Sequence, residues 1–417
     1  MSKIKQIEAR EILASGGWPT IEAEVQLEDG STASASVSYG ASAGSKEAYI
    51  LLDGDESRYD GKGMLKAVNN VENRIAPLLL DREANAQQEL DKIMIAADGT
   101  ANKSELGGNA ILAVSMAVAR AASVSAKLEL YQYLTQTYQL EPTNNSLPHP
   151  MMVMIEGGQH ADNSTDLQEY LITIEDDKGA EENVQRGLAV YKEVGKLLRQ
   201  AGYTTNIGNE GAFAPAGIKN NEEPLEYLTK AIKRADYGAS EIAIAIDAAA
   251  SEFYQDGKYF LKREGQTLNA AGLLARYSEW LKKYPLKSIE DPLSEFDWDN
   301  WPAALEQLKP ARIVADDITV TNAKLLQQGI DKKIANAIII KLNQAGTVTE
   351  TITACQLAKQ NSWAIIPSHR GGGETKDTFL TDLAVATGAE YIKVGPTQEE
   401  RIAKYDRLIE IEGRLKI

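Results

Sequence analysis

A short apolar run that ends in a charged residue recurs six times in the second half of the chain. The first run is Ile242–Ile246 and the last is Tyr391-Ile392, and after one interval of 43 residues the spacing is 24 to 28 residues. Each interval has room for a strand, a helix and two loops, and helical patterning fills the gaps at Asn322–Ile334 and Thr347–Lys359. Repeated strand–helix units predict a parallel sheet, and in a closed (β/α)8 barrel the strands end at one mouth, where active sites lie. The repeat therefore predicts a barrel whose mouth carries Asp247, Glu290, Asp316, Lys341, His369 and Lys393.

The residues before this repeat predict a smaller domain with a sheet and helices. Apolar and polar side chains alternate over residues 4–37, and Asp29-Gly30 is a hairpin turn signal, so an antiparallel sheet is expected. A loop rich in Gly, Ser and Ala follows at residues 38–47 and is expected to be mobile. Helical periodicity then runs over residues 64–133, with a break expected at Pro77.

A proline-rich linker over residues 138–150 separates the two parts of the chain. The second part begins irregularly, because strands expected at Met151–Ile155 and Gln168–Ile174 precede its first helix. We therefore predict an α/β protein with an N-terminal α+β domain over residues 1–137 and a C-terminal barrel over residues 138–417.

Composition restricts the partners that the chain can bind. The formal net charge of −16 leaves no basic field to neutralise phosphates, so nucleic acid is not expected as a partner. Cys355 is the single cysteine, so an intrachain disulfide is excluded, which suits a reducing cytosol. We expect its side chain in the core. No apolar signal follows Met1, and the longest apolar stretch, Ala110–Ala122, is shorter than a membrane span. We expect a cytoplasmic protein without a membrane partner.

Three of the charged strand ends are carboxylates, namely Asp247, Glu290 and Asp316. Carboxylates that converge on one face repel one another unless a cation neutralises them, and oxygen ligands without a Cys or His cluster suit Mg2+ or Mn2+. Each acid alone could instead cap a helix that follows its strand, a role for which the neighbouring Asp291 and Asp317 are better candidates. The pattern therefore predicts a divalent metal site held by the three strand-end acids.

Two cationic strand ends and a glycine run predict further chemistry at the mouth. Lys341 continues the buried run Ile338–Ile340, and a desolvated ammonium has a lowered pKa and can act as a base; the alternative is a side chain that reaches back to solvent. Lys393 follows its own strand in the same way. Arg370 and Gly371-Gly372-Gly373 offer a fixed cation and exposed backbone N–H groups, which predicts an anion site, although a polar loop that merely leaves a strand has the same composition.

Three further candidates, a histidine and two acids, lie in or near glycine-rich turns. His160 lies in the turn Gly157–Ala161, upstream of Glu169, and a turn with a purely structural role explains this pattern as well as a functional site does. Glu210 lies between Gly208 and Gly211, where an acid has little local reason to be ordered, and this favours a functional role. Because the chain has three histidines and His149 falls in the linker, His160 and His369 remain for chemistry.

Taken together, these segments resemble enolase, the glycolytic enzyme family that interconverts 2-phosphoglycerate and phosphoenolpyruvate, over nearly the whole chain. The resemblance implies an enolase-type (β/α)8 barrel with one antiparallel strand, a hydro-lyase that depends on two Mg2+ ions per site, and a homodimer or a larger homo-oligomer. The segments that carry it are Tyr39–Gly44, Gly158–Ala161, Gln168-Glu169, Gly208–Gly211, Ile246–Tyr254, Ile289–Pro292, Ala315–Asn322, Ile340–Gln344, Ser368–Arg370 and Gly373–Thr375.

The resemblance also implies a role for each candidate residue. The strand-end acids Asp247, Glu290 and Asp316 would hold the first Mg2+, and Ser42 would help to bind the second together with the substrate phosphate. Lys341 would be the base and Glu210 the acid. The residues expected around the substrate and its phosphate are His160, Glu169, His369, Arg370, Gly371, Gly372 and Lys393.

The implied reaction sets conditions on these groups. Lys341 must be neutral to accept the proton beside the substrate carboxylate, and nearby cations are expected to lower its pKa. Glu210 must be protonated to help hydroxide leave, and the carboxylate of Glu169 is expected to raise its pKa. Metal ions and Lys393 would stabilise the enediolate charge as it develops.

Several positions at the rim depart from the family pattern. Asn209 replaces an Asp, Ser38-Tyr39 replaces a Pro-Ser pair, and Gly371–Gly373 replaces the Ser that follows His-Arg. Val394–Pro396 and Ala14–Trp18 also differ from the usual sequences, the latter at an expected subunit contact. These changes leave two alternatives open, namely a paralogue that acts on a related phospho- or carboxylated acid and an inactive binding protein on the same fold.

Overall fold

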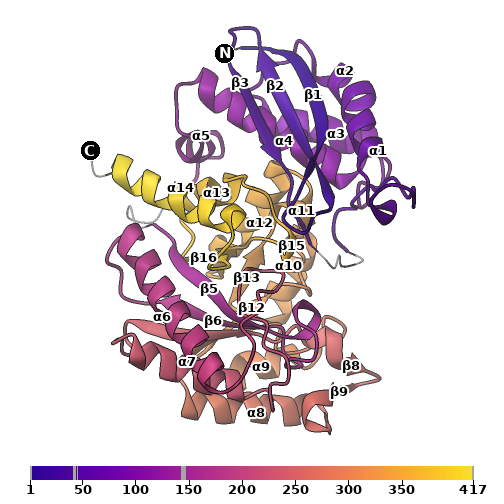
Figure 1. Ribbon diagram of the computed structural model, residues 1–417. Coiled ribbons are helices and arrows are strands. Elements are labelled where there is room, and N and C mark those ends of the chain that lie inside the picture. Colours follow the sequence, from indigo (N-terminus) through magenta and orange to yellow (C-terminus); the bar gives the residue numbers. More distant parts are fainter. Residues whose placement is uncertain (1, 41–43, 45, 142–146, 416–417) are drawn as a thin grey trace.

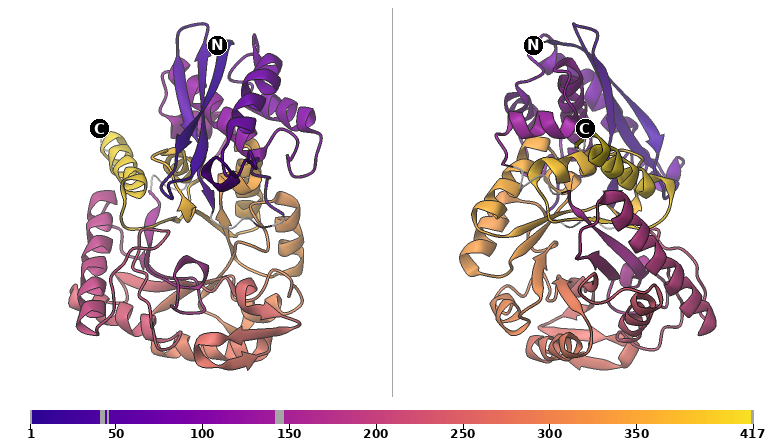
Figure 2. Two further views of the ribbon diagram at one scale, coloured as in Figure 1. Left: turned by 45° about the vertical axis from the view of Figure 1, so that its right-hand side comes forward. Right: turned by 90° about the vertical axis from the view of Figure 1, so that its left-hand side faces the viewer.

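A small α+β domain, drawn in indigo and purple in Figure 1, stacks on one end of a larger barrel that is drawn from magenta to yellow. The two further views in Figure 2 show the same stacking from other sides. The structure is a computed structural model, and it describes residues 2–40, 44, 46–141 and 147–415.

The N-terminal sheet has the antiparallel order that the alternating pattern predicts. Strands β1 (Ile4–Leu13), β2 (Pro19–Leu27) and β3 (Thr32–Ser36) lie in sequence order, and the turn at Asp29-Gly30 joins β2 to β3. One face of the sheet packs on helices. The bounds of the principal ones are α3 (Gln87–Asp98), α4 (Gly108–Ser125) and α5 (Leu130–Thr137).

Pro77 does not break the helical segment in which it lies. Helix α1 (Leu65–Asn70) continues through a π-helical turn at Val71–Ile75 into α2 (Ala76–Leu79). In a regular α-helix a proline ring crowds the carbonyl group of the preceding turn and supplies no N–H for its hydrogen bond. The π turn changes the hydrogen-bond spacing directly before Pro77, where this conflict would occur. The expected break at Pro77 is therefore wrong, because the π turn accommodates the proline.

Helix α4 is the central helix of the N-terminal domain. By length and composition it could cross a membrane, with a mean hydropathy of 1.3 over 18 residues, and it is longer than the apolar stretch expected from the sequence. However, 83% of it is buried inside the protein. A core helix has the same composition, and α4 packs on β2 and β3 as such a helix.

The second domain is the barrel that the repeat predicts. Its eight strands have the order β14-β13-β12-β11-β7-β6-β5-β16. Strand β6 is antiparallel to both of its neighbours, the other pairs are parallel, and a bridge between Ser368 and Lys393 connects the two ends of the sheet. The strand bounds are β5 (His149–Glu156), β6 (Glu169–Ile174), β7 (Ile242–Asp247), β11 (Leu286–Glu290), β12 (Arg312–Ala315), β13 (Ala337–Ile340), β14 (Ala364–Pro367) and β16 (Tyr391–Val394).

Helices connect successive strands around the outside of the barrel. The long first interval contains a small antiparallel sheet of β8 (Tyr254–Gln255), β9 (Lys258–Leu261) and β10 (Gln266–Leu268), inserted between β7 and the next helix. The helices are α6 (Ala180–Gln200), α7 (Glu223–Arg234), α8 (Ala270–Lys283), α9 (Trp301–Gln307), α10 (Ala323–Lys332), α11 (Leu342–Ala345), α12 (Val348–Gln360), α13 (Phe379–Thr387) and α14 (Glu399–Leu415). Cys355 is buried in α12, as expected.

His149 belongs to the barrel and not to the linker. It is the first residue of β5, where its Nδ1 lies 2.8 Å from the carbonyl oxygen of Ile174. This end of β5 is opposite to the end at which Glu156 enters the mouth, so His149 is remote from the candidate chemistry. The expected linker is thus shorter than residues 138–150.

Side chains that point inward fill the barrel below its mouth. Alternate residues of neighbouring strands form a separate apolar cluster there, while the residues between them pack against the outer helices. The interior is therefore closed, and chemistry is confined to the strand ends. The cluster includes Met151, Val153, Leu171, Ala245, Val314, Ile339 and Ile366.

An ion pair joins the two domains beside the mouth. Arg120 on α4 contacts Asp377 with two N–H···O bonds of 2.6 and 2.8 Å, and Asp377 also accepts from the backbone N–H of Ser36 and of Phe379. The paired side chains are 19% and 7% exposed. A single carboxylate thus fixes α4, β3 and the start of α13 relative to one another.

We expect Asp377→Ala to lower the free energy of unfolding by about 3 kcal/mol, because it leaves Arg120 partly buried without its partner. Urea unfolding followed by circular dichroism would measure the loss. Glu89→Ala is the control, since its pair with Arg82 is exposed, and should change the value by less than about 0.5 kcal/mol. Equal effects of the two substitutions would contradict the role given to Asp377.

Candidate active site

A cavity of about 330 Å³ opens at the barrel end where the parallel strands finish. The N-terminal domain closes one side of it through Gly40, Gly44 and Glu47. Glu290 is 2% exposed and does not line the cavity, Gly372 lies outside it, and Ser42 falls outside the described residues. The candidate residues that line it are His160, Glu169, Glu210, Asp247, Asp316, Lys341, His369, Arg370, Gly371 and Lys393.

Lys393 neutralises most of the carboxylates on one wall of this cavity. Its Nζ lies 2.8 Å from both oxygens of Glu290, 2.9 Å from Glu169 Oε2 and 3.5 Å from Asp247 Oδ2. Burial alone would lower the pKa of Lys393, but Glu169 and Glu290 raise it well above its usual value. The cation that these acids require is supplied here by the protein itself.

Asp316 is paired with Lys341 instead. The Lys341 ammonium donates to Asp316 Oδ2, and Gln344 Nε2 donates to Asp316 Oδ1 at 3.1 Å. Burial opposes the charge on Lys341, but the Asp316 carboxylate raises the pKa of Lys341 to about 12. The lowered pKa expected for Lys341 is thus not found in this structure, because an anion and not a cation is its nearest charged neighbour.

Asp291 supports Asp316 and Asp317, and neither Asp291 nor Asp317 is the N-cap of a described helix, the role considered for them from the sequence. The carboxylate of Asp291 accepts from the backbone N–H of Asp316 at 3.0 Å and of Asp317 at 2.9 Å, so it orients the end of β12. Burial and the Asp317 carboxylate raise the pKa of Asp291 well above its usual value, and burial and Asp316 raise the pKa of Asp317 to about 8. The negative charge gathered here exceeds what the local ammonium groups neutralise.

The donor set fits a hard divalent cation. Among the described residues, Asp291, Asp316 and Asp317 each offer an oxygen within 4.8 Å of the others'. The expected trio of Asp247, Glu290 and Asp316 is not grouped as tightly, because Lys393 Nζ lies between Glu290 and Asp247. All of these acids are oxygen donors, as Mg2+ and Mn2+ prefer.

Glu210 lies between two histidines. His160 Nδ1 is 3.7 Å from Glu210 Oε2, and His369 Nε2 is 3.7 Å from Glu210 Oε1. Glu169 lies close enough to Glu210 and His160 for the three to offer ligand atoms within 4.8 Å of one another. Two carboxyl groups and two imidazoles therefore share one buried corner of the cavity.

The pKa directions in this corner are the reverse of those expected. Burial would raise the pKa of Glu210, but His160 and His369 lower it well below its usual value. Burial raises the pKa of Glu169 well above its usual value, and the Glu210 charge adds to this effect. Glu169 and not Glu210 is therefore the carboxyl group that favours the protonated form in this corner, because the histidines face Glu210 more directly.

Arg401 determines which ring nitrogen of His369 carries a proton. The Arg401 Nε donates to His369 Nδ1 at 3.2 Å, and a guanidinium cannot accept a hydrogen bond. His369 Nδ1 must therefore be unprotonated, so the neutral ring has its proton on Nε2, which faces Glu210. Burial lowers the pKa of His369 to about 3, which agrees with a neutral ring.

Arg370 is held at the boundary of the two domains. Its guanidinium lies 3.2 Å from Glu47 Oε2, and the backbone of Gly40 packs against it so closely that a Cβ on Gly40 would lie 2.1 Å from a guanidinium nitrogen. The N-terminal domain therefore supplies both the counter-charge and the space for this cation. Glu47 had no signal in the sequence that marked it for this role.

The glycine run after Arg370 forms a domain contact and not a continuous anion nest. Strand β15 (Gly372–Gly373) pairs with β4 (Tyr39–Gly40), and the Gly372 N–H donates to the carbonyl of Asn209 at 3.1 Å. A Cβ on Gly373 would lie 2.7 Å from the Tyr39 ring. The phosphate contact expected of Gly372 is therefore not met, since its N–H is already used, whereas Gly371 still lines the cavity.

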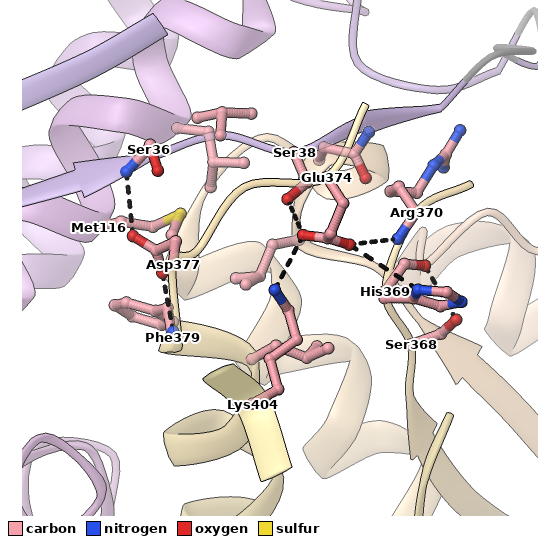
Figure 3. Close-up of a pocket in the computed structure, with 15 residues that line it drawn as sticks. Ser36, Ser38, Met116, Ser368, His369, Arg370, Glu374, Asp377, Phe379 and Lys404 are labelled. Atoms are coloured by element: carbon pink, nitrogen blue, oxygen red, sulfur yellow. Dashed lines mark hydrogen bonds and ion pairs between the residues drawn. The ribbon is translucent and has the colours of Figure 1, made fainter. Parts of the chain in front are cut away.

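Glu374 organises the layer behind His369 and Arg370 (Figure 3). It accepts from the backbone N–H of Arg370 at 2.9 Å and from the Ser38 hydroxyl, and Lys404 Nζ lies 3.0 Å away. Burial would raise the pKa of Glu374, but Lys404 lowers it to about 2. One ionised carboxylate thus ties the loop after β14 to the N-terminal domain and to α14.

Sequence reasoning missed the residues behind the cavity. Arg401 and Lys404 lie five and eight residues past Pro396 in a charged helical segment, which indicates a solvated face. Both side chains are in fact 2% exposed or less. Glu156 also carried no signal, although it directly precedes the Gly157-Gly158 turn that was singled out.

The fold and the cavity together define a class. The chain is a (β/α)8 barrel with one antiparallel strand and a capping α+β domain, and the carboxylates, lysines and histidines at its buried mouth could perform acid–base chemistry and hold a cation. The comparisons with known proteins then specify the family.

The chain belongs to the enolase family. The family model described as the enolase N-terminal domain matches residues 4–134, and the model described as the enolase C-terminal TIM barrel domain matches residues 144–416. The chain is 48% identical to the enolase of Elusimicrobium minutum (strain Pei191) over 417 residues, which cover all of this chain and 97% of that protein. It is 47% identical to the enolase of Helicobacter hepaticus (strain ATCC 51449 / 3B1) over 419 residues, with the same coverage.

The charge states of the two cavity histidines can be measured by 15N NMR. We expect His369 to stay neutral, with its proton on Nε2, between about pH 5 and pH 9, because its lowered pKa of about 3 lies below that range. The Glu210 charge outweighs burial and raises the pKa of His160 to about 9, so His160 should be charged at neutral pH and lose its proton as the pH passes that value.

Arg401→Gln serves as the comparison, since it removes the fixed donor at His369 Nδ1. In that variant His369 should begin to show the other tautomer. A His369 that titrates near its ordinary pKa in the unsubstituted protein would contradict this description.

Proposed function

We propose that this chain catalyses the reversible dehydration of 2-phosphoglycerate to phosphoenolpyruvate as a Mg2+-dependent hydro-lyase. The observation that carries the proposal is a buried mouth in which Lys341 and Glu210 line the same cavity as strand-end carboxylates. We further propose that it works in the cytoplasm in glycolysis and gluconeogenesis, as a homodimer or larger homo-oligomer. Membership of the enolase family supports each part.

Asp247, Glu290 and Asp316 would hold one Mg2+, with Asp291 and Asp317 beside Asp316. A second ion would bind with the substrate phosphate and Ser42. Bound Mg2+ supplies positive charge that stabilises the enediolate formed when the substrate loses a proton. The chain's own cation, Lys393, adds to this stabilisation from the Glu290 side of the cavity.

Lys341 would accept the proton from C2 of the substrate. It can do so only as a neutral amine, and its ion pair with Asp316 keeps it charged. Any cation that takes over the Asp316 carboxylate weakens this pair and lowers the pKa of Lys341. Cation binding and activation of the base are therefore coupled through one carboxylate.

Glu210 would donate the proton that allows hydroxide to leave. The corner that it shares with Glu169 holds a proton on the pair, and two carboxyl groups so close cannot both ionise freely. His369 contributes a fixed Nε2–H toward Glu210, and His160 a positive charge. Arg370 and Gly371 are the proposed phosphate contacts.

Activity with 2-phosphoglycerate is the first test. With Mg2+ the purified protein should form the enol product, followed by its ultraviolet absorbance, and chelation of the metal should abolish the signal. Asp316→Asn should depress kcat by roughly 10²- to 10⁴-fold and raise the Mg2+ concentration needed, because it removes a ligand and the Lys341 partner. Absence of product from the unsubstituted protein would refute the proposed reaction.

Base and acid should separate in an exchange experiment. Lys341→Ala should abolish exchange of the C2 proton with solvent deuterium, because it removes the proposed base. Glu210→Gln should retain exchange and lose elimination, since only the second step needs its proton. Mass spectrometry of recovered substrate measures the first step. Wild-type exchange by Lys341→Ala would exclude Lys341 as the base.

A further inference from the structure

Glu156 is a buried acid that the mechanism has not used. It is the last residue of β5 and is fully buried. Each of its carboxyl oxygens lies 3.1 Å from the backbone nitrogen of Glu210, and Oε1 also accepts from the N–H of Ala212 at 2.9 Å. Its carboxyl group therefore binds the backbone of the turn that carries the proposed acid.

The turn Gly208–Ala212 is packed directly on this carboxyl group. A Cβ on Gly208 would lie 2.3 Å from Glu156 Oε2, so a residue without a side chain is needed at that position. On its other side the turn is held by Arg401, which donates to the carbonyl of Asn209 at 2.6 Å. The turn is thus fixed between a carboxyl group and a guanidinium.

The side chain of Glu210 depends on this backbone support. Its Oε2 has no hydrogen-bond partner among the described residues, and the two nearest histidine nitrogens are 3.7 Å away, which is beyond hydrogen-bond distance. The histidines thus hold the Glu210 carboxyl group through two longer contacts and not through a short hydrogen bond. Its position therefore also depends on the conformation of residues 208–212.

We propose that Glu156 is a positioning residue for the acid step, which it serves by holding the backbone of Glu210. This inference rests on the proposed function, because it assigns a role within that reaction. Displacement of a proton donor by about 1 Å can reduce a rate about 100-fold, so a carboxyl group that holds the donor through its backbone matters to the rate. Glu156 does not line the cavity, so it acts on the proposed acid only through the backbone of the turn.

The charge state of Glu156 suggests a conservative variant. The groups that face it are Glu210 and His160 from the two turns, Glu169 opposite it on β6 and Tyr191 on α6. Burial and the Glu210 charge raise the pKa of Glu156 to about 8, so it is mostly neutral at pH 7. Glutamine has the same shape, is neutral, and keeps an oxygen that can accept both N–H groups.

The test measures C2 exchange and elimination separately at pH 7. Glu156→Ala should lower elimination about 100-fold and leave exchange within a few-fold of the unsubstituted protein, as Glu210→Gln does. Glu156→Gln should keep both rates within a few-fold. If Glu156 had only a structural role, Glu156→Ala would lower the rates of exchange and elimination together, and that result would overturn the proposal. An elimination rate that is unchanged in Glu156→Ala would overturn it as well.

A second variant covers the case in which Glu156→Ala does not fold. Gly208→Ala leaves Glu156 in place but pushes the turn away from it, so it should also lose elimination and keep exchange. Its control is Gly413→Ala, whose added Cβ meets no atom within 4 Å and which should change neither rate. If the unsubstituted protein itself shows no exchange and no elimination, the proposed function fails; if only these variants disagree, the role of Glu156 fails.

Discussion

Neutralisation of buried negative charge is the constraint on which the barrel mouth depends. Parallel strands bring Asp247, Glu290 and Asp316 to one buried surface, and carboxylates so placed destabilise the fold unless cations face them. Lys393 and Lys341 meet this requirement from two other strand ends of the same barrel. In the proposed reaction the same two lysines have chemical roles, because Lys393 would stabilise the enediolate as an ammonium group and Lys341 would accept the C2 proton once it is neutral. Stability of the mouth and its proposed chemistry therefore depend on one set of ion pairs.

The N-terminal domain completes this centre, because it supplies the Glu47 carboxylate that pairs with Arg370. Glu47 pairs with Arg370, Gly40 allows the guanidinium to approach, and Ser38 donates to Glu374 behind the loop. The ion pair between Arg120 and Asp377 holds the two domains at the distance that these contacts need. The capping domain is thus a structural part of the candidate site, and its position determines where the cation at the proposed phosphate site lies.

The fold and the strand-end residues could be predicted from the sequence because periodicity reports them directly. A short apolar run followed by a charge marks a strand end, and the cavity collects all of these strand-end charges except Glu290. The pKa directions of Lys341 and Glu210 could not be predicted, since they depend on which neighbour lies closest in three dimensions. Arg401 and Glu156 were missed for the same reason, because each acts on residues more than thirty positions away in the chain. At Pro77 and Gly372 the sequence identified residues with special backbone properties but not the backbone structure that they adopt. Pro77 follows a π turn and does not break the helical segment, and Gly372 pairs with β4 and does not present its N–H to the cavity.

The departures from the family pattern at the rim form one connected structure. Tyr39 lies over Gly373, where any larger residue would collide with its ring, so the aromatic residue and the glycine run require each other. Asn209 participates through its backbone carbonyl, which accepts from both Gly372 and Arg401. Because a backbone carbonyl is present whatever the side chain, the change at position 209 leaves this link intact. The rim residues that depart from the family pattern are therefore connected by contacts with one another, and the contacts that hold Glu210, His369 and Arg370 are present. This arrangement favours an unchanged reaction over a new one.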